Sequence, residues 1–244
     1  MKAKKLEGIV ISETNYSESS KILNIYTKEL GIVSVISKGC RRLKSPLRSV
    51  SSRLIYGNFI VSYKEGGLST LINVDILCNF STIFKDIEKI SFATYILELA
   101  SQVAKQNNSV EIFDTLIESL KKINEGIDAQ IITLIVELQY LKYLGIDVDF
   151  DECSICGNKD DIVTFNVDKH GYVCKNCYSN EKIVSQKSVK VIRLLYHVDI
   201  SRLTKLDLSS TTINEISSFL EEYYDKYSGL FLKSKKFIKL INNK

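Results

Sequence analysis

The sequence predicts an α+β fold in which a small β-barrel precedes a helical region that carries an inserted four-cysteine element. Three observations lead to this prediction. The first eighty residues hold five short runs rich in Ile, Val and Tyr, separated by turn residues. From Asp86 onward the apolar residues recur with the period of a helix. Two C-x-x-C units then interrupt the helical pattern. We therefore expect a domain over 1–80 and a helical domain over 81–244, with the cysteine element at about 150–183.

The first part reads as a series of strands with turn residues between them, such as Gly31 and the Gly66 and Gly67 pair. Five short strands in this length suit a small closed barrel, and the OB-fold has that number of strands. Periodicity alone does not distinguish an OB-fold from an SH3-like barrel. The expected strands are Glu7–Thr14, Lys21–Thr27, Ile32–Ser37, Leu54–Lys64 and Leu68–Cys78.

The second part shows helical periodicity from its first helix. Phe92, Tyr95, Ile96, Leu99 and Val103 fall on one helical face. The third of the expected helices is apolar nearly all round, which predicts the buried centre of the helical region. The further helices are expected at Val110–Ile123, at Ala129–Leu144 with Gly145 ending it, at Lys187–His197, and along the stripe from Ile216 to Tyr227 that Gly229 closes.

Four cysteines in two C-x-x-C units predict one structural zinc ion. Cys153 and Cys156 form the first unit and Cys174 and Cys177 the second, and seventeen residues separate the units. This spacing is typical of zinc ribbons and treble clefs. Four thiolates fill a tetrahedral site and leave no open position for an activated water, so we expect a structural metal. His170, three residues before Cys174, is a weaker competing ligand.

The alternative interpretation of these cysteines is two disulfide bonds. Glu7 interrupts the apolar core that a signal peptide would need, so we expect a cytoplasmic chain. The apolar run at Ile131–Val136 is too short to span a bilayer, and we expect no membrane association. Thiols stay reduced in the cytoplasm, which favours the metal. The isolated Cys40 and Cys78 are expected to be packing residues.

The positive charges are unevenly distributed although the net charge is only +4. No acidic residue occurs from Leu30 through Tyr63, and a second acid-free run follows Asp225. Local excess of this kind favours a polyanionic partner such as nucleic acid, although a charge run is often only a solvated surface. The cations of the first run are Lys38, Arg41, Arg42, Lys44, Arg48 and Arg53, and those of the second are Lys226, Lys233, Lys235, Lys236, Lys239 and Lys244.

No motif nominates an enzyme. The sequence has no phosphate-binding G-x-x-x-x-G-K-[ST] loop, no G-x-G-x-x-G after a strand and no G-x-S-x-G elbow. We therefore expect neither catalysis nor a small-molecule substrate. Aromatic residues on the strands are candidates for stacking on bases, but most are expected to lie in the core. They are Tyr16, Tyr26, Tyr56, Phe59 and Tyr63.

Several segments, in this order along the chain, resemble the RecO family of bacterial recombination mediators. In the basic stretch, Cys40 stands where the family usually has alanine, and Lys235 stands where its carboxy-terminal signature often has arginine. Neither change removes a charge. The matching segments are Leu6–Ile11, Tyr16–Leu23, Tyr26–Gly31, Lys38–Arg42 with Ser45, the four-cysteine element, Phe219–Tyr223 and Gly229–Phe237.

The resemblance implies an amino-terminal OB-fold, a helical domain with an inserted zinc element, and binding of single- and double-stranded DNA. It also implies annealing of complementary strands and help in loading a recombinase onto coated single-stranded DNA. The implied partners are RecR and the single-stranded-DNA-binding protein, and the implied location is the nucleoid. Two other classes remain open: an RNA-binding zinc protein, and a protein-interaction adaptor whose carboxy-terminal lysines receive an acidic tail.

Overall fold

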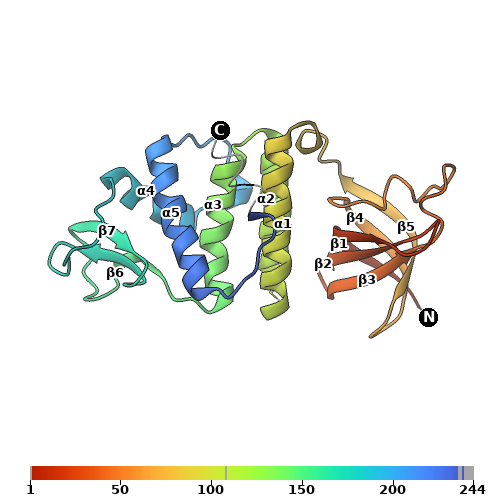
Figure 1. Cartoon of the computed structure of the whole chain (residues 1–244), viewed down its shortest axis with the longest axis horizontal. Helices are drawn as coiled ribbons and strands as arrows, with labels where there is room; N and C mark the ends of the chain where they lie inside the picture. Colours follow the sequence, from red (N-terminus) through yellow and green to blue (C-terminus); the bar gives the residue numbers. More distant parts are fainter. Residues whose placement is uncertain (1, 108, 236–237, 239–244) are drawn as a thin grey trace.

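The computed structural model describes residues 2–107, 109–235 and 238. The barrel lies at one end of the molecule, the helices lie in the middle, and a small three-stranded sheet lies at the other end (Figure 1). The predicted α+β architecture is confirmed.

Five strands close into a barrel with the order β1-β2-β3-β5-β4. β3 and β5 run parallel, and every other neighbouring pair is antiparallel, including the β1–β4 pair that closes the barrel. A closed five-stranded barrel is the OB-like fold that the sequence predicts. The strands are β1 (Lys2–Asn15), β2 (Lys21–Thr27), β3 (Gly31–Ser37), β4 (Tyr56–Tyr63) and β5 (Ser69–Cys78).

The first strand begins five residues before the position that the sequence suggests. The lysine-rich start shows no apolar alternation, yet its backbone pairs with β4 from Lys2 opposite Tyr63 onward. Strand pairing uses backbone groups, so polar side chains do not prevent it. Lys4 lies 4.1 Å above the ring of Tyr63, which adds a cation–π contact.

Most of the aromatic residues on the strands belong to the core. Tyr26, Tyr56 and Phe59 are buried, so the structure excludes them as stacking platforms on the barrel surface. Tyr16 is 59% exposed. Tyr63 is partly exposed, and the ammonium group of Lys4 lies over its ring.

Each α-helix among the described residues is preceded by a capping residue whose side-chain oxygen accepts a backbone N–H, as at Asp86, Ser109 and Asp128. The third helix lies at the centre and is buried on nearly all sides, as its composition predicts. Its last four expected residues form a separate 3-10 turn, Leu141–Leu144, which Gly145 ends with a φ of 67°. The helices are α1 (Ile87–Gln106), α2 (Val110–Glu125), α3 (Ala129–Tyr140), α4 (Gln186–His197) and α5 (Ser210–Tyr227).

The barrel and the helices share one hydrophobic core. Ile9, Tyr26, Leu54 and Tyr56 of the barrel part belong to the same buried cluster as the inner faces of the helices. A separate cluster fills the barrel interior. No helix in the described part of the chain is long and apolar enough to cross a membrane.

Candidate metal centre and basic surface

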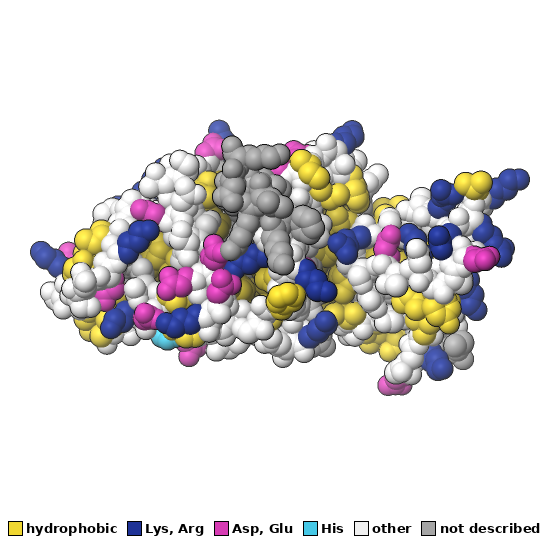
Figure 2. Space-filling view, in the orientation of Figure 1, with side chains coloured by type: hydrophobic (Ala, Val, Ile, Leu, Met, Phe, Trp, Pro, Cys, Tyr) yellow, Lys and Arg dark blue, Asp and Glu magenta, His cyan; other side chains and the backbone are white. Residues whose placement is uncertain are grey.

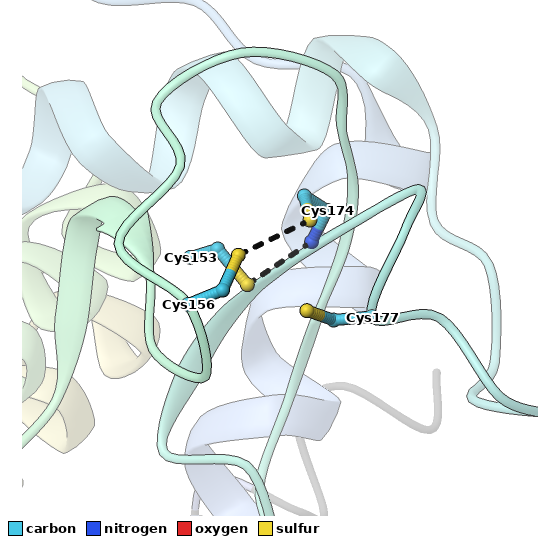
Figure 3. Close-up of side chains that lie close together, drawn as sticks. All are labelled: Cys153, Cys156, Cys174 and Cys177. Atoms are coloured by element: carbon cyan, nitrogen blue, oxygen red, sulfur yellow. Dashed lines mark hydrogen bonds between the residues drawn. The ribbon is translucent and has the colours of Figure 1, made fainter.

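A three-stranded sheet positions the four cysteines. Its strands are β6 (Asp149–Cys153), β7 (Ile162–Asn166) and β8 (Gly171–Cys174), in the order β6-β8-β7. Because β6 and β8 are parallel, their last residues, Cys153 and Cys174, lie at the same edge of the sheet. β6 and β8 are each followed by a tight turn, which brings the second cysteine of each C-x-x-C unit back toward this edge (Figure 3).

The turns are closed by backbone hydrogen bonds. The N–H of Gly157 donates to the carbonyl of Cys153 over 2.8 Å, and the N–H of Cys177 donates to the carbonyl of Cys174 over 3.1 Å. The four Sγ atoms consequently lie within 4.8 Å of one another, and those of Cys156 and Cys174 are 3.7 Å apart. Sulfurs bound to one tetrahedral zinc at about 2.3 Å lie about 3.8 Å from each other. The spacing of the cluster therefore fits a metal centre.

None of the six cysteines forms a disulfide bond. The 3.7 Å between Cys156 and Cys174 Sγ is far above the length of about 2.05 Å for a disulfide. Cys40 is buried and Cys78 is half-buried, and both lie outside the cluster. The structure therefore contradicts the interpretation of the two C-x-x-C units as two disulfide bonds.

The electrostatics of the cluster favour a bound cation. Burial opposes charge on Cys153, but N–H groups, among them that of Cys174 at 3.4 Å, lower the pKa of its thiol to about 6. The neighbouring sulfur of Cys156 and partial burial raise the pKa of Cys177 to about 12. Four thiols this close cannot all ionise without a positive charge between them. A divalent metal supplies that charge.

Gly171 permits the close approach of β6 and β8. Its φ is 135°, and a Cβ at this position would lie 2.0 Å from the carbonyl oxygen of Asp149. His170, the weaker ligand candidate, lies outside the cluster. Its Nδ1 lies 2.8 Å from the hydroxyl of Tyr223 on α5, so the histidine joins the element to a helix.

The cysteine element packs into the helical core through aromatic contacts that the sequence alone did not predict. The ring of Phe150 on β6 meets the rings of Tyr172, Tyr196 and Phe219 edge to face, with centroids 5.5 to 5.8 Å apart. These partners lie on β8, α4 and α5. An apolar residue at the start of an inserted strand is the only sequence signal for this contact.

The basic residues of the first acid-free run lie on the long connection between β3 and β4, residues 38–55, which we call the basic loop. All six of its cations are exposed, and none has an ion-pair partner within the described residues. Lys and Arg side chains gather on the arm of the barrel that projects away from the helices (Figure 2). The set predicted from sequence is Lys38, Arg41, Arg42, Lys44, Arg48 and Arg53.

The basic loop is anchored to the barrel near its start. Cys40 is buried, and the N–H of Arg41 donates to the carbonyl of Ser19 over 3.0 Å. The Nη1 of Arg41 donates to the carbonyl of Ser17 over 2.9 Å. A buried contact between the hydroxyls of Ser37 and Ser51, at 2.7 Å, joins the two stems of the loop.

Near its carboxy-terminal end the basic loop contains a residue with an unusual backbone conformation. Leu54 has a φ of 66°, which a leucine rarely adopts, and its side chain is buried in the core shared with the helices. Its N–H donates to the carbonyl of Val10 over 3.0 Å, and the N–H of Val10 donates to the carbonyl of Ile55 over 2.9 Å. These bonds hold the strained residue in place and fix the position of its neighbour, Arg53.

The carboxy-terminal cations are partly neutralised, unlike those of the basic loop. Lys226 pairs with Asp168, and Lys235 pairs with Asp225 over 2.6 Å. Lys233 is exposed, and its side chain forms no ion pair with any residue that the structure describes. Three further lysines of this run and Phe237 of the carboxy-terminal signature lie outside the described residues: Lys236, Lys239 and Lys244.

Comparison with known proteins supports the resemblance of the sequence motifs. The family description "Recombination protein O N terminal" matches residues 1–80, and "Recombination protein O C terminal" matches residues 85–236. The chain is 35% identical to the DNA repair protein RecO of Bacillus pumilus strain SAFR-032, over 96% of this chain and 93% of that protein.

Two further relatives show a similar relationship. The chain is 34% identical to the DNA repair protein RecO of Listeria monocytogenes serotype 4b strain CLIP80459 and 32% identical to that of Bacillus subtilis strain 168. Both matches cover 96% of this chain and 93% of the relative. The barrel, the helical part and the four-cysteine element thus stand in a chain that belongs to the RecO family of DNA repair proteins.

Proposed function

We propose that this protein is a DNA-binding recombination mediator that binds single- and double-stranded DNA, anneals complementary strands and helps to load a recombinase onto coated single-stranded DNA. The observation that carries the proposal is the basic loop, whose six exposed cations lie on an OB-like barrel and form no ion pair with any described residue. Membership of the RecO family supports the same conclusion. Residues 1–80 would form the DNA-binding domain and residues 81–244 the helical domain.

The cations of the basic loop are proposed to contact phosphates. Arginine and lysine side chains on an exposed loop follow a phosphate backbone without the constraints of core packing. Phosphate contacts position a protein on DNA and do not read base sequence. We therefore expect binding that depends strongly on salt and weakly on sequence. The proposed contacts are Lys38, Arg41, Arg42, Lys44, Arg48 and Arg53.

The proposed metal is one zinc ion held by Cys153, Cys156, Cys174 and Cys177. An all-sulfur tetrahedral donor set is typical of structural zinc, and four thiolates leave no position for a substrate. The metal would hold β6 and β8 at the spacing that the parallel pair requires. Its role in this proposal is to stabilise the helical part.

The proposed protein partners are RecR and the single-stranded-DNA-binding protein, and the proposed location is the bacterial nucleoid in the cytoplasm. Support for these partners comes from the family alone. The protein-adaptor alternative depends on the carboxy-terminal lysines, two of which already form ion pairs. The RNA-binding alternative makes the same use of the basic loop and is separated from ours by comparing DNA and RNA strands of one sequence.

The decisive experiment combines Arg41→Ala with Arg42→Ala and measures DNA affinity across salt concentrations together with strand annealing. Removing one phosphate contact to a single strand lowers the slope of log affinity against log salt by about 0.7. The matched control is Lys187→Ala with Lys190→Ala, two exposed lysines on α4. If the Arg41 and Arg42 variant binds and anneals DNA as the parent does, the basic loop is only a solvated surface.

A further inference from the structure

A cleft of about 500 Å³ lies where the barrel meets the helical part. Its walls come from three parts of the molecule: the barrel, α1 and the segment after α5. The barrel side consists of Ile11, Ser12, Asn24, Ile32 and Arg53, the α1 side consists of Thr94, Glu98, Ser101 and Lys105, and the carboxy-terminal segment adds Lys233 and Ser234.

Three cations border this cleft. Arg53 comes from the end of the basic loop, Lys105 from the last turn of α1, and Lys233 from the segment after α5. All three side chains are exposed, and none has an acidic partner among the residues placed by the structure. Lys and Arg side chains stand on both sides of the boundary between barrel and helices (Figure 2).

Glu98 is the one acidic residue among the described residues that line the cleft, and its carboxylate binds the carboxy-terminal segment. It accepts the N–H of Lys233 over 3.1 Å and the N–H of Ser234 over 2.8 Å, and it also accepts the hydroxyl of Ser234. Nearby, the side-chain amide of Gln102 donates to the carbonyl of Phe231 over 2.7 Å. These bonds hold Lys233 at the cleft, where three cations and one carboxylate stand among the described lining residues.

The barrel side of the cleft supplies polar groups beside an apolar surface. The side chain of Asn24 donates to Ser12 over 2.9 Å and accepts from Ser34 over 2.7 Å, which fixes the amide. Ile11 and Ile32 line the same wall. A nucleotide unit needs this combination, because its phosphate requires cations while its sugar and base pack on apolar surface.

We propose that the cleft binds a phosphodiester segment of the same DNA strand that contacts the basic loop, with Lys105 and Lys233 as phosphate contacts. This inference rests on the proposed DNA binding. Arg53 belongs to both surfaces, because it lies in the basic loop and lines the cleft. The strand would therefore run from the barrel onto α1, and the carboxy-terminal lysine would serve DNA binding.

The test uses the full chain with Lys105→Gln and Lys233→Gln combined, and Lys187→Gln with Lys190→Gln as the matched control on α4. Affinity is measured across salt concentrations for oligothymidines of about 4 to 16 nucleotides, the range of OB-fold site sizes. We expect the salt slope for the longest strand to fall by about 1.4, which is two contacts of about 0.7 each. Binding of the shortest strand, which the basic loop alone accommodates, stays unchanged.

Three outcomes contradict the inference. If the Lys105 and Lys233 variant shows the same salt slope of DNA affinity as the parent, the cleft does not bind DNA. If the Arg41 and Arg42 variant still binds DNA more weakly in the same experiment, the proposed function is unaffected. Weaker binding of the cleft variant to a polyglutamate peptide, with unchanged DNA binding, assigns the cleft to an acidic protein partner instead. Absence of salt-dependent DNA binding in the parent protein defeats the proposed function itself. Both lysines are exposed, so unchanged thermal unfolding will show that the variant is folded.

Discussion

The ring of Tyr26 on β2 meets the ring of Phe113 on α2 edge to face, with centroids 5.3 Å apart and planes at 84°. Both side chains are buried. Close by, Lys28 forms an ion pair with Asp114 over 2.7 Å across the same junction. The aromatic pair lies inside the shared core, whereas the ion pair is exposed to solvent, and the two contacts should differ greatly in their contribution to stability.

We expect Phe113→Ala to lower the free energy of unfolding by about 3–5 kcal/mol, because it removes a large buried side chain at the junction. Asp114→Asn removes the neighbouring ion pair and should change stability by about 0–1 kcal/mol. Urea unfolding followed by far-ultraviolet circular dichroism will measure both. Similar small effects for the two variants would show that the barrel is not held by this core contact.

Gly171→Ala should abolish metal binding although it changes no cysteine. The added methyl group would lie 2.0 Å from the carbonyl oxygen of Asp149, so β6 and β8 would have to separate and move the two cysteine pairs apart. Gly145→Ala is the matched control, because Gly145 also has a positive φ but has open space around its Cβ position. Elemental analysis of both purified variants decides the matter, and a full metal content in Gly171→Ala would contradict the role given to this glycine.

Cys174→Ser should lose the metal and destabilise the helical part, because binding of a structural metal supplies folding free energy. Cys78→Ser, at a half-buried cysteine outside the cluster, should keep the metal. Metal content and thermal unfolding will distinguish the two. The barrel has its own core and should remain folded in both variants. The prediction fails if parent protein prepared without chelator contains no metal.

Glu137 on α3 should make the folded protein less stable as the pH rises from 4.5 to 7. Burial raises the pKa of its carboxyl from 4.5 to about 7, while the bond from Tyr95 and the charge of Lys235 lower it. The folded state therefore holds a proton that the unfolded state has released over this range. The full difference between the pKa values of Glu137 in the folded and unfolded states corresponds to about 3 kcal/mol. Because the side chain has partial access to solvent, we expect the free energy of unfolding to fall by about 1–3 kcal/mol.

The measurement compares unfolding free energy against pH for the parent and for Glu137→Gln, whose amide still accepts the hydroxyl of Tyr95. The difference between the two proteins should change between pH 4.5 and 7 and stay constant above 7. This difference cancels the titration of the cysteines, which is common to both proteins. A constant difference across the whole range would show that Glu137 is ionised in the folded state.

The sequence predicted most elements because their signals are local. The runs rich in Ile, Val and Tyr that form β2 and β3, and the single apolar face of α1, depend only on neighbouring positions. The spacing of the cysteines likewise predicted which side chains come together. The start of β1 was missed because its lysines carry no alternation, and its pairing with β4 involves residues about sixty positions away.

The features that sequence reasoning missed all join distant segments. The contact between Phe150 and Phe219 connects an inserted strand to the last helix. The cleft brings Arg53, Lys105 and Lys233 together, and the bonds from Lys233 and Ser234 to Glu98 span more than one hundred residues. A polar stripe on α1, at Thr94, Glu98, Ser101 and Lys105, is visible in the sequence, but its periodicity does not reveal what faces it.

The position of the cysteine element within the chain has a consequence for synthesis on the ribosome. All five barrel strands precede residue 79, so the barrel can close while the rest of the protein is still being made. All four cysteines of the cluster have been synthesised once the chain reaches residue 177. Phe219, which packs against Phe150, is synthesised about forty residues later. The nascent element can therefore gather its thiolates before α5 covers Phe150. Early capture of the metal would hold the element together during this interval.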